Sequence, residues 1–196
     1  CEKTHRGVLT GSPLTDVRIT LVAGRAHIKH TVGGDFRQAT YRAVRQGLME
    51  AESVLLEAYY EFTLERPTEC VGSAMTDFER MCGRFQIADS DNQTGQSTIT
   101  GLVPVSSFGD YQLELNSYTK GLGKISCRMA GYMPCHNTEE VLLAKGYTPE
   151  ADTRNPSDSV FCSGGSGYNV PWNEVFLKMH LPSALQNPTD ATTGEF

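Results

Sequence analysis

The sequence contains no run of about 20 consecutive apolar residues, which is the length that a membrane-spanning helix needs. It also lacks a charged segment followed by an apolar stretch at its start, so nothing in it indicates secretion. We therefore expect a cytoplasmic protein without a membrane partner. The chain starts at Cys1 rather than Met and opens in the middle of a pattern, which suggests a piece of a larger protein.

The sequence contains no CxxC motif. Its six cysteines stand at positions 1, 70, 82, 127, 135 and 162. Reduced thiols are the default for a cytoplasmic protein. A zinc ion held by Cys127, Cys135, His136 and Cys162 is conceivable, since thiolate and imidazole are the usual ligands of structural zinc. However, the seven residues between Cys127 and Cys135 do not make a zinc knuckle. We interpret the cysteines as small buried apolar residues and expect no metal site.

Motifs of the common catalytic sites are also missing. The SGGSG segment at 163–167 has neither the lysine nor the spacing of a phosphate-binding P-loop, and it matches the GxSxG nucleophile motif only loosely. His27 and His30 lie three residues apart with no third metal ligand nearby. A small acyl phosphatase would need a phosphate-cradling loop at 65–68, where this chain has no glycine. We expect neither catalytic residues nor a cofactor in this chain.

Acidic residues are absent between positions 17 and 34, although the whole chain has a net charge of −6. Residues 1–50 carry eight Lys or Arg against four Asp or Glu, a net of +4, so residues 51–196 carry −10. A basic region on an acidic body permits docking on phosphates at one end. A solvated basic face without a partner is the alternative interpretation.

The segment from Asp16 to Leu48 reads as a strand, a basic loop and a helix. Val17, Ile19 and Leu21 alternate as one side of a strand, and Gly24 then allows a turn. The loop that follows closes at 33–34 and contains Arg25, His27, Lys29 and His30. Asp35 stands at the expected N-cap of a helix whose apolar positions are Phe36, Ala39, Ala43, Val44 and Leu48. A cationic loop held between a strand and a helix favours binding to an anionic partner.

A second unit begins near Ala58 and has the element order βαββαβ. The apolar patterns and turn signals predict strands at 60–64, 85–87, 98–103 and 125–129, helices at 67–82 and 106–119, and a polar hairpin loop at 90–96. This order is typical of a four-stranded antiparallel sheet with two helices on one face.

After Tyr132 the pattern changes to short elements. We expect a helix at 137–145 with Gly146 as its C-cap, turns at 150–159 and a flexible turn at 163–167. A final amphipathic helix at 172–180 presents Trp172, Val175, Phe176 and Met179. We interpret this helix as a cover for the open face of the second unit rather than a partner-binding element. Residues 187–196 have no apolar periodicity, and we expect them to be loose.

Several motifs in succession resemble the C-terminal portion of elongation factor G over residues 7–132. They are GVLTGSPLTDVRITLVAGRAH, DFRQATYRAVRQGL, ESVLLEAYYEFTLERPTECVGSAMTDFERMCGRF and VPVSSFGDYQLELNSYTKGLGKISCRMAGY. Within that family the sequence is most similar to the tetracycline ribosomal protection proteins. These proteins share the DFR at the helix start, the LLE junction, and a C-terminal extension ending in a helix.

The resemblance implies an α+β chain of four parts. Residues 1–56 resemble the C-terminal half of the domain IV arm, with a ribosomal S5 domain 2-like fold, and residues 57–132 resemble the ferredoxin-like domain V. Residues 133–181 form the C-terminal extension with its terminal helix, and residues 182–196 a disordered tail. Half of domain IV alone leaves a sheet edge unpartnered, so we expect residues 1–56 to pack differently from an intact relative or to pair with another copy.

The resemblance also implies a function. The loop is the tip of the domain IV arm, and it contacts rRNA of the small-subunit decoding centre to release tetracycline, through Arg25, Ala26, His27, Ile28, Lys29, His30, Thr31 and Val32. Domain V lies near the GTPase-associated rRNA of the large subunit. The chain lacks the GTPase domain, so GTP and Mg²⁺ belong to the parent protein. The alternatives are an elongation factor G paralogue acting in translocation and a stand-alone RNA-binding or adaptor module; no DNA partner is expected.

Overall fold

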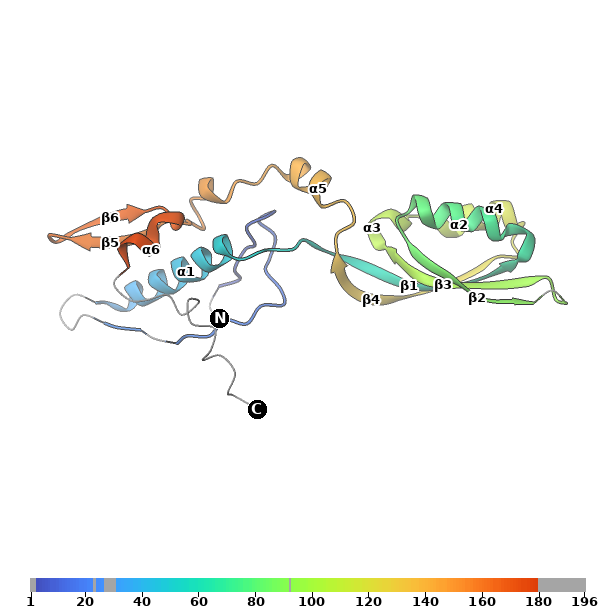
Figure 1. The fold of residues 1–196 in the computed structure, drawn as a ribbon, viewed down its shortest axis with the longest axis horizontal. Helices are drawn as coiled ribbons and strands as arrows, with labels where there is room; N and C mark the ends of the chain where they lie inside the picture. The colour runs from blue at the N-terminus through green and yellow to red at the C-terminus, as the bar shows by residue number, and fades with distance from the viewer. Residues whose placement is uncertain (1–2, 23, 27–30, 92, 180–196) are drawn as a thin grey trace. The chain divides into compact units, whose positions relative to one another are not determined.

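The computed structural model describes residues 3–22, 24–26, 31–91 and 93–179 (Figure 1). It divides into two compact units, one made of Cys1–Ser53 with Leu142–Phe196 and the other of Val54–Val141. We call them the split unit and the sheet unit. In the described ranges, no helix has both the length and the apolar character that crossing a bilayer requires.

The sheet unit has the predicted βαββαβ order, so the ferredoxin-like α+β prediction is confirmed. Its four strands pair antiparallel in the order β2-β3-β1-β4. The helices lie together on one face of this sheet (Figure 1). The strands are β1 (Leu56–Pro67), β2 (Arg84–Asp91), β3 (Gln96–Pro104) and β4 (Lys124–Pro134). The helices are η1 (Thr68–Cys70), α2 (Val71–Arg80), α3 (Val105–Phe108) and α4 (Tyr111–Thr119).

The core of the sheet unit lies between the sheet and these helices. Strand alternation directs every second side chain of β1 and β3 inward, and helical spacing does the same for α2 and α4. The Phe62 and Phe78 rings stack with centroids 4.0 Å apart. The buried residues of this core are Phe62, Leu64, Ala74, Phe78, Met81, Ile99, Val103, Tyr111 and Leu115.

The predicted helices of this unit are interrupted or shortened. The expected helix at 106–119 is wrong as a single element, because Gly109 has a φ of 48° and separates α3 from α4. Glycine adopts this conformation without the steric cost that other residues incur. The expected helix at 67–82 ends at Arg80, and Cys82 takes a left-handed φ of 57°.

The split unit is built around one long helix. Helix α1 (Gly33–Glu50) contacts β5 and η3, and it lies along the β5–β6 hairpin in Figure 1. The hairpin follows a short η2 and precedes the last helical turns. These elements are η2 (Pro149–Ala151), β5 (Ser159–Ser163), β6 (Ser166–Val170), η3 (Trp172–Glu174) and α6 (Val175–Lys178). Helix α5 (Thr138–Lys145) crosses the boundary between the two units.

Three predictions for the start of the split unit need correction. No strand forms over 17–21, and Val17, Ile19 and Leu21 are exposed, Leu21 to 84%. A strand needs a neighbour to take its backbone hydrogen bonds, and the described residues pair none with this segment. Asp35 is not the N-cap but the third residue of α1, where it accepts a hydrogen bond from the Val32 N–H at 2.9 Å. Phe36, expected to face inward, is 53% exposed.

The C-terminal predictions also change. The turn predicted at 163–167 joins two strands, β5 and β6, which the sequence did not predict. The final helix is only Val175–Lys178, and its segment groups with α1 in the split unit instead of with the second unit. His180, Cys1 and the tail at 182–196 lie outside the described residues.

Candidate nucleic-acid interface

The predicted tip loop is only partly visible in the described residues. His27, Ile28, Lys29 and His30 lie outside them. Arg25, Ala26 and Val32 are exposed, and Thr31 is half-buried just before α1. Contact of this loop with rRNA stays a prediction.

The structure shows a second basic site, which we call the basic pocket. It is a cavity of about 170 Å³ in the split unit. Its lining carries five cationic side chains and one histidine, and no Asp or Glu lies among its described lining residues. The residues that line it are Lys3, His5, Arg6, Gln38, Tyr41, Arg42, Arg45, Leu48, Arg154, Asn155 and Pro156.

Helix α1 supplies the inner wall of the basic pocket. Residues three or four positions apart lie on one helix face, so the spacing of Gln38, Arg42 and Arg45 directs them to the same side. Asp158 holds Arg42 in place, because the Arg42 Nη1 donates to a carboxylate oxygen at 2.8 Å and to the backbone carbonyl at 2.6 Å. The N-terminal segment and the 154–156 loop complete the wall.

Arg45 is the buried centre of the site and is only 4% exposed. Its guanidinium donates to the Arg6 carbonyl at 2.9 Å and to the Tyr147 hydroxyl at 2.6 Å, while its Nε has no hydrogen-bond partner among the described residues. Within the same ranges no carboxylate touches it directly; Tyr147 in turn donates to Asp152 Oδ2 at 2.7 Å. A buried charge without a direct counterion is costly, so an anion bound nearby would stabilise this arrangement.

Lys3 and His5 also line the pocket, and they contribute one positive charge and one hydrogen-bonding group. Lys3 Nζ lies 5.0 Å from the centroid of the Tyr41 ring, a cation–π contact. Burial lowers the pKa of His5 from its ordinary value, and the charge of Lys3 lowers it further. His5 is therefore neutral at pH 7 and offers a hydrogen bond rather than a charge.

The stability of the split unit in acid should depend on the Asp152 carboxylate. The Asn155 side chain, the Tyr147 hydroxyl and backbone N–H groups of 154 and 155 donate to it and lower its pKa from 3.8 to about 2. A depressed pKa means that its stabilising contribution is present above pH 3.8 and is lost as the pH falls toward 2. We expect the split unit to lose stability over this range, measured as unfolding midpoints at each pH. Asp152→Asn should show a smaller change; an equal change in both proteins would contradict the assignment.

Sequence reasoning missed the basic pocket because its residues come from three distant segments. Arg42 and Arg45 are visible as a helical pair, but nothing local connects them with Lys3 or Arg154. The predicted burial of the cysteines is wrong, because Cys82, Cys127 and Cys162 are exposed and Cys70 and Cys135 are only half-buried. The five described cysteines are free thiols. The four residues considered from the sequence as zinc ligands do not come together as one group. Cys135 and His136 lie with Glu57, and this group includes neither Cys127 nor Cys162.

Two family models match the chain along most of its length. Elongation factor G, domain IV, matches residues 1–52, and the elongation factor G C-terminus matches residues 54–141. The chain belongs to the elongation factor G family. The second match coincides almost residue for residue with the sheet unit.

Two curated relatives from this family are similar to the chain at the same level. The tetracycline resistance protein TetP of Clostridium perfringens is 34% identical over 131 residues, which cover 66% of this chain and 20% of that protein. Elongation factor G 2 of Streptomyces coelicolor (strain ATCC BAA-471 / A3(2) / M145) is 34% identical over 126 residues, which cover 64% of this chain and 18% of that protein. The chain thus spans about a fifth of these elongation factor G family members, and neither relative is favoured over the other.

A solved structure from Thermus thermophilus aligns with half of the chain. The alignment has a TM-score of 0.45 and 23% sequence identity, and it covers 50% of this chain and 15% of the other.

Proposed function

We propose that this chain is the ribosome-binding C-terminal part of an elongation factor G-like GTPase, and that its split unit contacts rRNA phosphates through the basic pocket. The observation that carries the proposal is the acid-free lining of that pocket. RNA backbones present closely spaced phosphates, and Arg and Lys side chains that neutralise them release counterions and gain affinity. The partner is the ribosome; GTP and Mg²⁺ belong to the parent protein, which acts in the cytoplasm.

The pocket has the two kinds of cation that such contact needs. Arg45 is held by hydrogen bonds without a direct carboxylate and provides a fixed positive charge, and Arg42 is held in an ion pair with Asp158. Arg6 and Arg154 are exposed and can reach a ligand. An arginine fork matches the geometry of a phosphate group with two parallel hydrogen bonds. The expected contact is therefore with phosphate oxygens, which position the protein without reading RNA sequence.

The finer assignment follows the family. The tip at 25–32 would contact decoding-centre rRNA, and the sheet unit would lie near the GTPase-associated rRNA of the large subunit. Release of tetracycline is one outcome of that contact, and translocation is the other. The tetracycline resistance relative and the elongation factor relative support these two outcomes equally. A stand-alone RNA-binding or adaptor role remains the alternative of a different class.

Loss of two exposed arginines tests the proposal. We expect the double change Arg6→Gln with Arg154→Gln to weaken binding of the chain to purified ribosomal particles. The slope of the logarithm of the binding constant against the logarithm of the salt concentration should also become shallower, by about 1 for each lost phosphate contact. Affinity is measured by fluorescence anisotropy over a series of salt concentrations.

Arg80→Gln is the matched control, because Arg80 is an exposed arginine of the sheet unit whose guanidinium pairs with Glu114 at 2.9 Å. It should leave both the affinity and the slope close to those of the unmodified chain. If the double variant binds with the same slope as this control, the basic pocket does not contact rRNA.

A further inference from the structure

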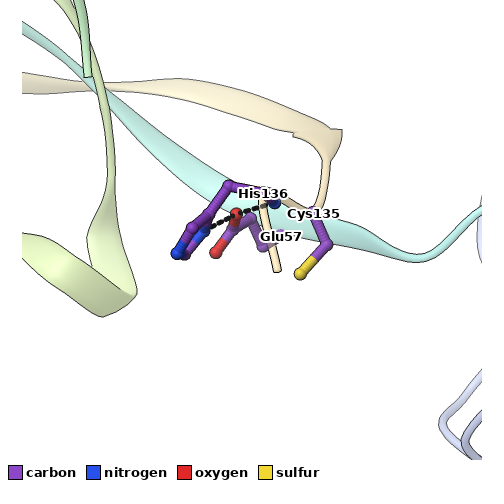
Figure 2. A group of neighbouring side chains, drawn as sticks. All are labelled: Glu57, Cys135 and His136. Carbon is purple, nitrogen blue, oxygen red and sulfur yellow. Dashed lines mark hydrogen bonds and ion pairs between the residues drawn. The ribbon is translucent and has the colours of Figure 1, made fainter. Parts of the chain in front are cut away.

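A cluster of three side chains in the sheet unit, far from the basic pocket in sequence, has the composition of a metal site. Glu57 comes from β1, and Cys135 and His136 follow directly after β4. Their carboxylate oxygen, sulfur and imidazole nitrogen atoms all lie within 4.8 Å of one another. Figure 2 shows the three side chains together at this end of the two strands.

The backbone holds these residues in place without a ligand. Leu56 pairs with Pro134 at the end of the β1–β4 ladder, and the Cys135 N–H continues the pairing by donating to the Leu55 carbonyl at 2.9 Å. The Thr138 hydroxyl donates to the Cys135 carbonyl at 3.0 Å and fixes the turn into α5. Sites on rigid sheet elements lose little conformational entropy when a ligand binds.

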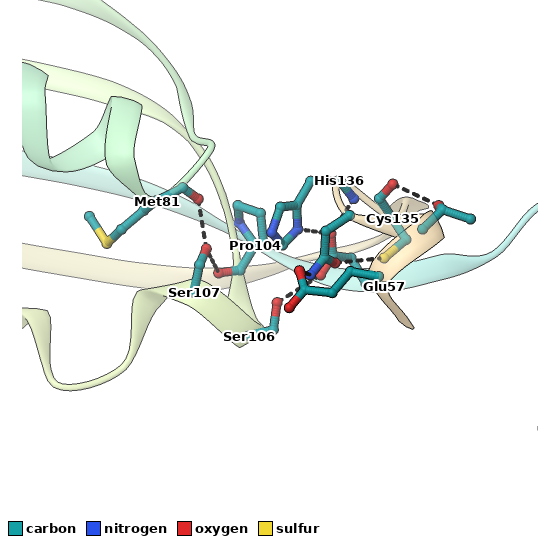
Figure 3. Close-up of polar contacts among 10 residues, drawn as sticks. Glu57, Met81, Pro104, Ser106, Ser107, Cys135 and His136 are labelled. Atoms are coloured by element: carbon teal, nitrogen blue, oxygen red, sulfur yellow. Dashed lines mark hydrogen bonds and ion pairs between the residues drawn. The ribbon is translucent and has the colours of Figure 1, made fainter. Parts of the chain in front are cut away.

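Polar contacts around the cluster orient each potential ligand (Figure 3). One Glu57 oxygen accepts from the His136 backbone N–H at 2.8 Å and lies 2.6 Å from its Nδ1, and the other accepts from the Ser106 hydroxyl at 2.8 Å. The Cys135 Sγ donates to Asn137 Oδ1 at 3.3 Å. Outer groups of this kind set the direction of metal ligands and tune their basicity.

The charge state of the cluster suits a cation. The side chains of Glu57 and His136 are 14% and 19% exposed. Burial by itself would raise the pKa of Glu57, but the hydrogen bonds from the His136 backbone and side chain and from Ser106 outweigh it and lower the pKa. The carboxylate is therefore ionised at neutral pH.

Without a metal, the same atoms make a hydrogen bond between imidazole and carboxylate. A metal ion can take the place of this hydrogen bond if the two atoms separate and the imidazole carries its proton on Nε2. Ligand bonds of about 2.0–2.1 Å in tetrahedral geometry place nitrogen and oxygen about 3.3 Å apart, so the observed 2.6 Å must widen by less than 1 Å. The Cys135 sulfur distinguishes a metal site from a simple hydrogen-bonded Glu–His pair, because it adds a third potential ligand atom to the group.

The geometry points to a zinc site formed by Glu57, Cys135 and His136, with a fourth position open to water. One oxygen, one nitrogen and one sulfur donor match zinc, whereas Mg²⁺ and Ca²⁺ take oxygen ligands. On binding, zinc displaces the thiol proton of Cys135 to solvent, and the single proton of the neutral His136 imidazole moves from Nδ1 to Nε2, so that the Nδ1 lone pair can bind the metal.

Cobalt and zinc titrations of the whole chain, purified with a chelator and kept reduced, test this site. Co²⁺ should produce visible d–d bands of a tetrahedral site and a sulfur-to-cobalt charge-transfer band in the near ultraviolet, and Zn²⁺ should abolish both. Cys135→Ser should remove the charge-transfer band and weaken Zn²⁺ binding by at least about tenfold, measured by competition with a chromophoric chelator. Cys127→Ser is the matched control, because Cys127 is a free, exposed cysteine of β4 and lies outside the cluster.

Two further variants separate ligation from folding. His136→Asn and Glu57→Gln should each weaken Zn²⁺ binding while the far-ultraviolet circular dichroism remains that of the unmodified chain. Zn²⁺ should also raise the unfolding midpoint of the unmodified chain, because a ligand that binds only the folded state stabilises it. Absence of a charge-transfer band in the unmodified chain, or a band that Cys127→Ser removes and Cys135→Ser retains, would overturn the assignment.

Discussion

Replacing Phe78 by Ala should lower the free energy of unfolding of the sheet unit by about 4 kcal/mol, the largest loss that we expect from a single substitution. Phe78 is fully buried and stacks on Phe62 with ring centroids 4.0 Å apart. The Phe78 ring also packs against the Tyr111 ring, with the two ring centroids 5.2 Å apart. Removing the ring leaves a cavity between α2 and the sheet, and the loss of aromatic pairing adds to the lost burial.

The measurement is chemical unfolding of the chain followed by circular dichroism. Phe36→Ala is the matched control, because Phe36 is a 53% exposed phenylalanine of α1 in the other unit. It should change the free energy of unfolding by no more than about 0.5 kcal/mol. A loss below about 1 kcal/mol for Phe78→Ala would show that the ring does not pack as described.

The second large effect is expected at Gly101, where Ala should destabilise the sheet unit by about 3 kcal/mol. A Cβ on Gly101 would lie 2.2 Å from the Arg84 carbonyl oxygen and 3.0 Å from the Phe62 ring. Gly101 pairs with Phe62 on β1 and with Phe85 on β2, so neither neighbouring strand can move without breaking its ladder. The missing side chain leaves room for the backbone of β2 and for the Phe62 ring at this point.

Gly72→Ala is the matched control in the same unit. Gly72 lies in α2, and an added Cβ there has no atom within 4 Å. Alanine should be neutral or stabilising by up to about 1 kcal/mol, because it forms helix more readily than glycine. Unfolding midpoints of the two variants should therefore shift in opposite directions or differ widely. Equal shifts would mean that the close approach at Gly101 is absent.

The sheet unit could be predicted well because its signals are local. Alternating apolar residues such as Phe62 and Leu64 mark a strand, and the apolar spacing of Ala74 and Phe78 marks a helix, whichever other parts of the chain surround them. The errors concern the helix ends and interruptions. The helix expected at 67–82 ends at Arg80, before the left-handed Cys82, and one glycine decides the other error. Gly109 lies inside a helical pattern, and its left-handed φ separates α3 from α4.

The split unit was predicted less well because its elements depend on distant partners. Val17, Ile19 and Leu21 have the alternation of a strand, yet an isolated strand cannot satisfy its backbone groups. The reverse error occurred on either side of the flexible turn predicted at 163–167, where no strand was expected and the structure forms the β5–β6 hairpin. Pairing in both places is decided by tertiary contacts, which alternation along one segment does not report.

The candidate sites divide in the same way. A run of basic residues near Arg25 is visible along the chain, so the tip could be proposed directly from the sequence. The basic pocket gathers Lys3, Arg42 and Arg154 from separate segments, and no local pattern connects them. Glu57 and His136 are 79 positions apart and meet only because β1 and β4 are neighbours in the sheet.

By itself, the sequence determined the family, the order of elements in the sheet unit and the uneven distribution of charge, because each of these depends on residue types and spacing along the chain. Only the tertiary structure decided which charges share one cavity, which helix covers which surface, and that a carboxylate, a thiol and an imidazole meet at one strand end. The physical reason is that hydrogen-bonded pairing and burial join residues without regard to their separation in sequence.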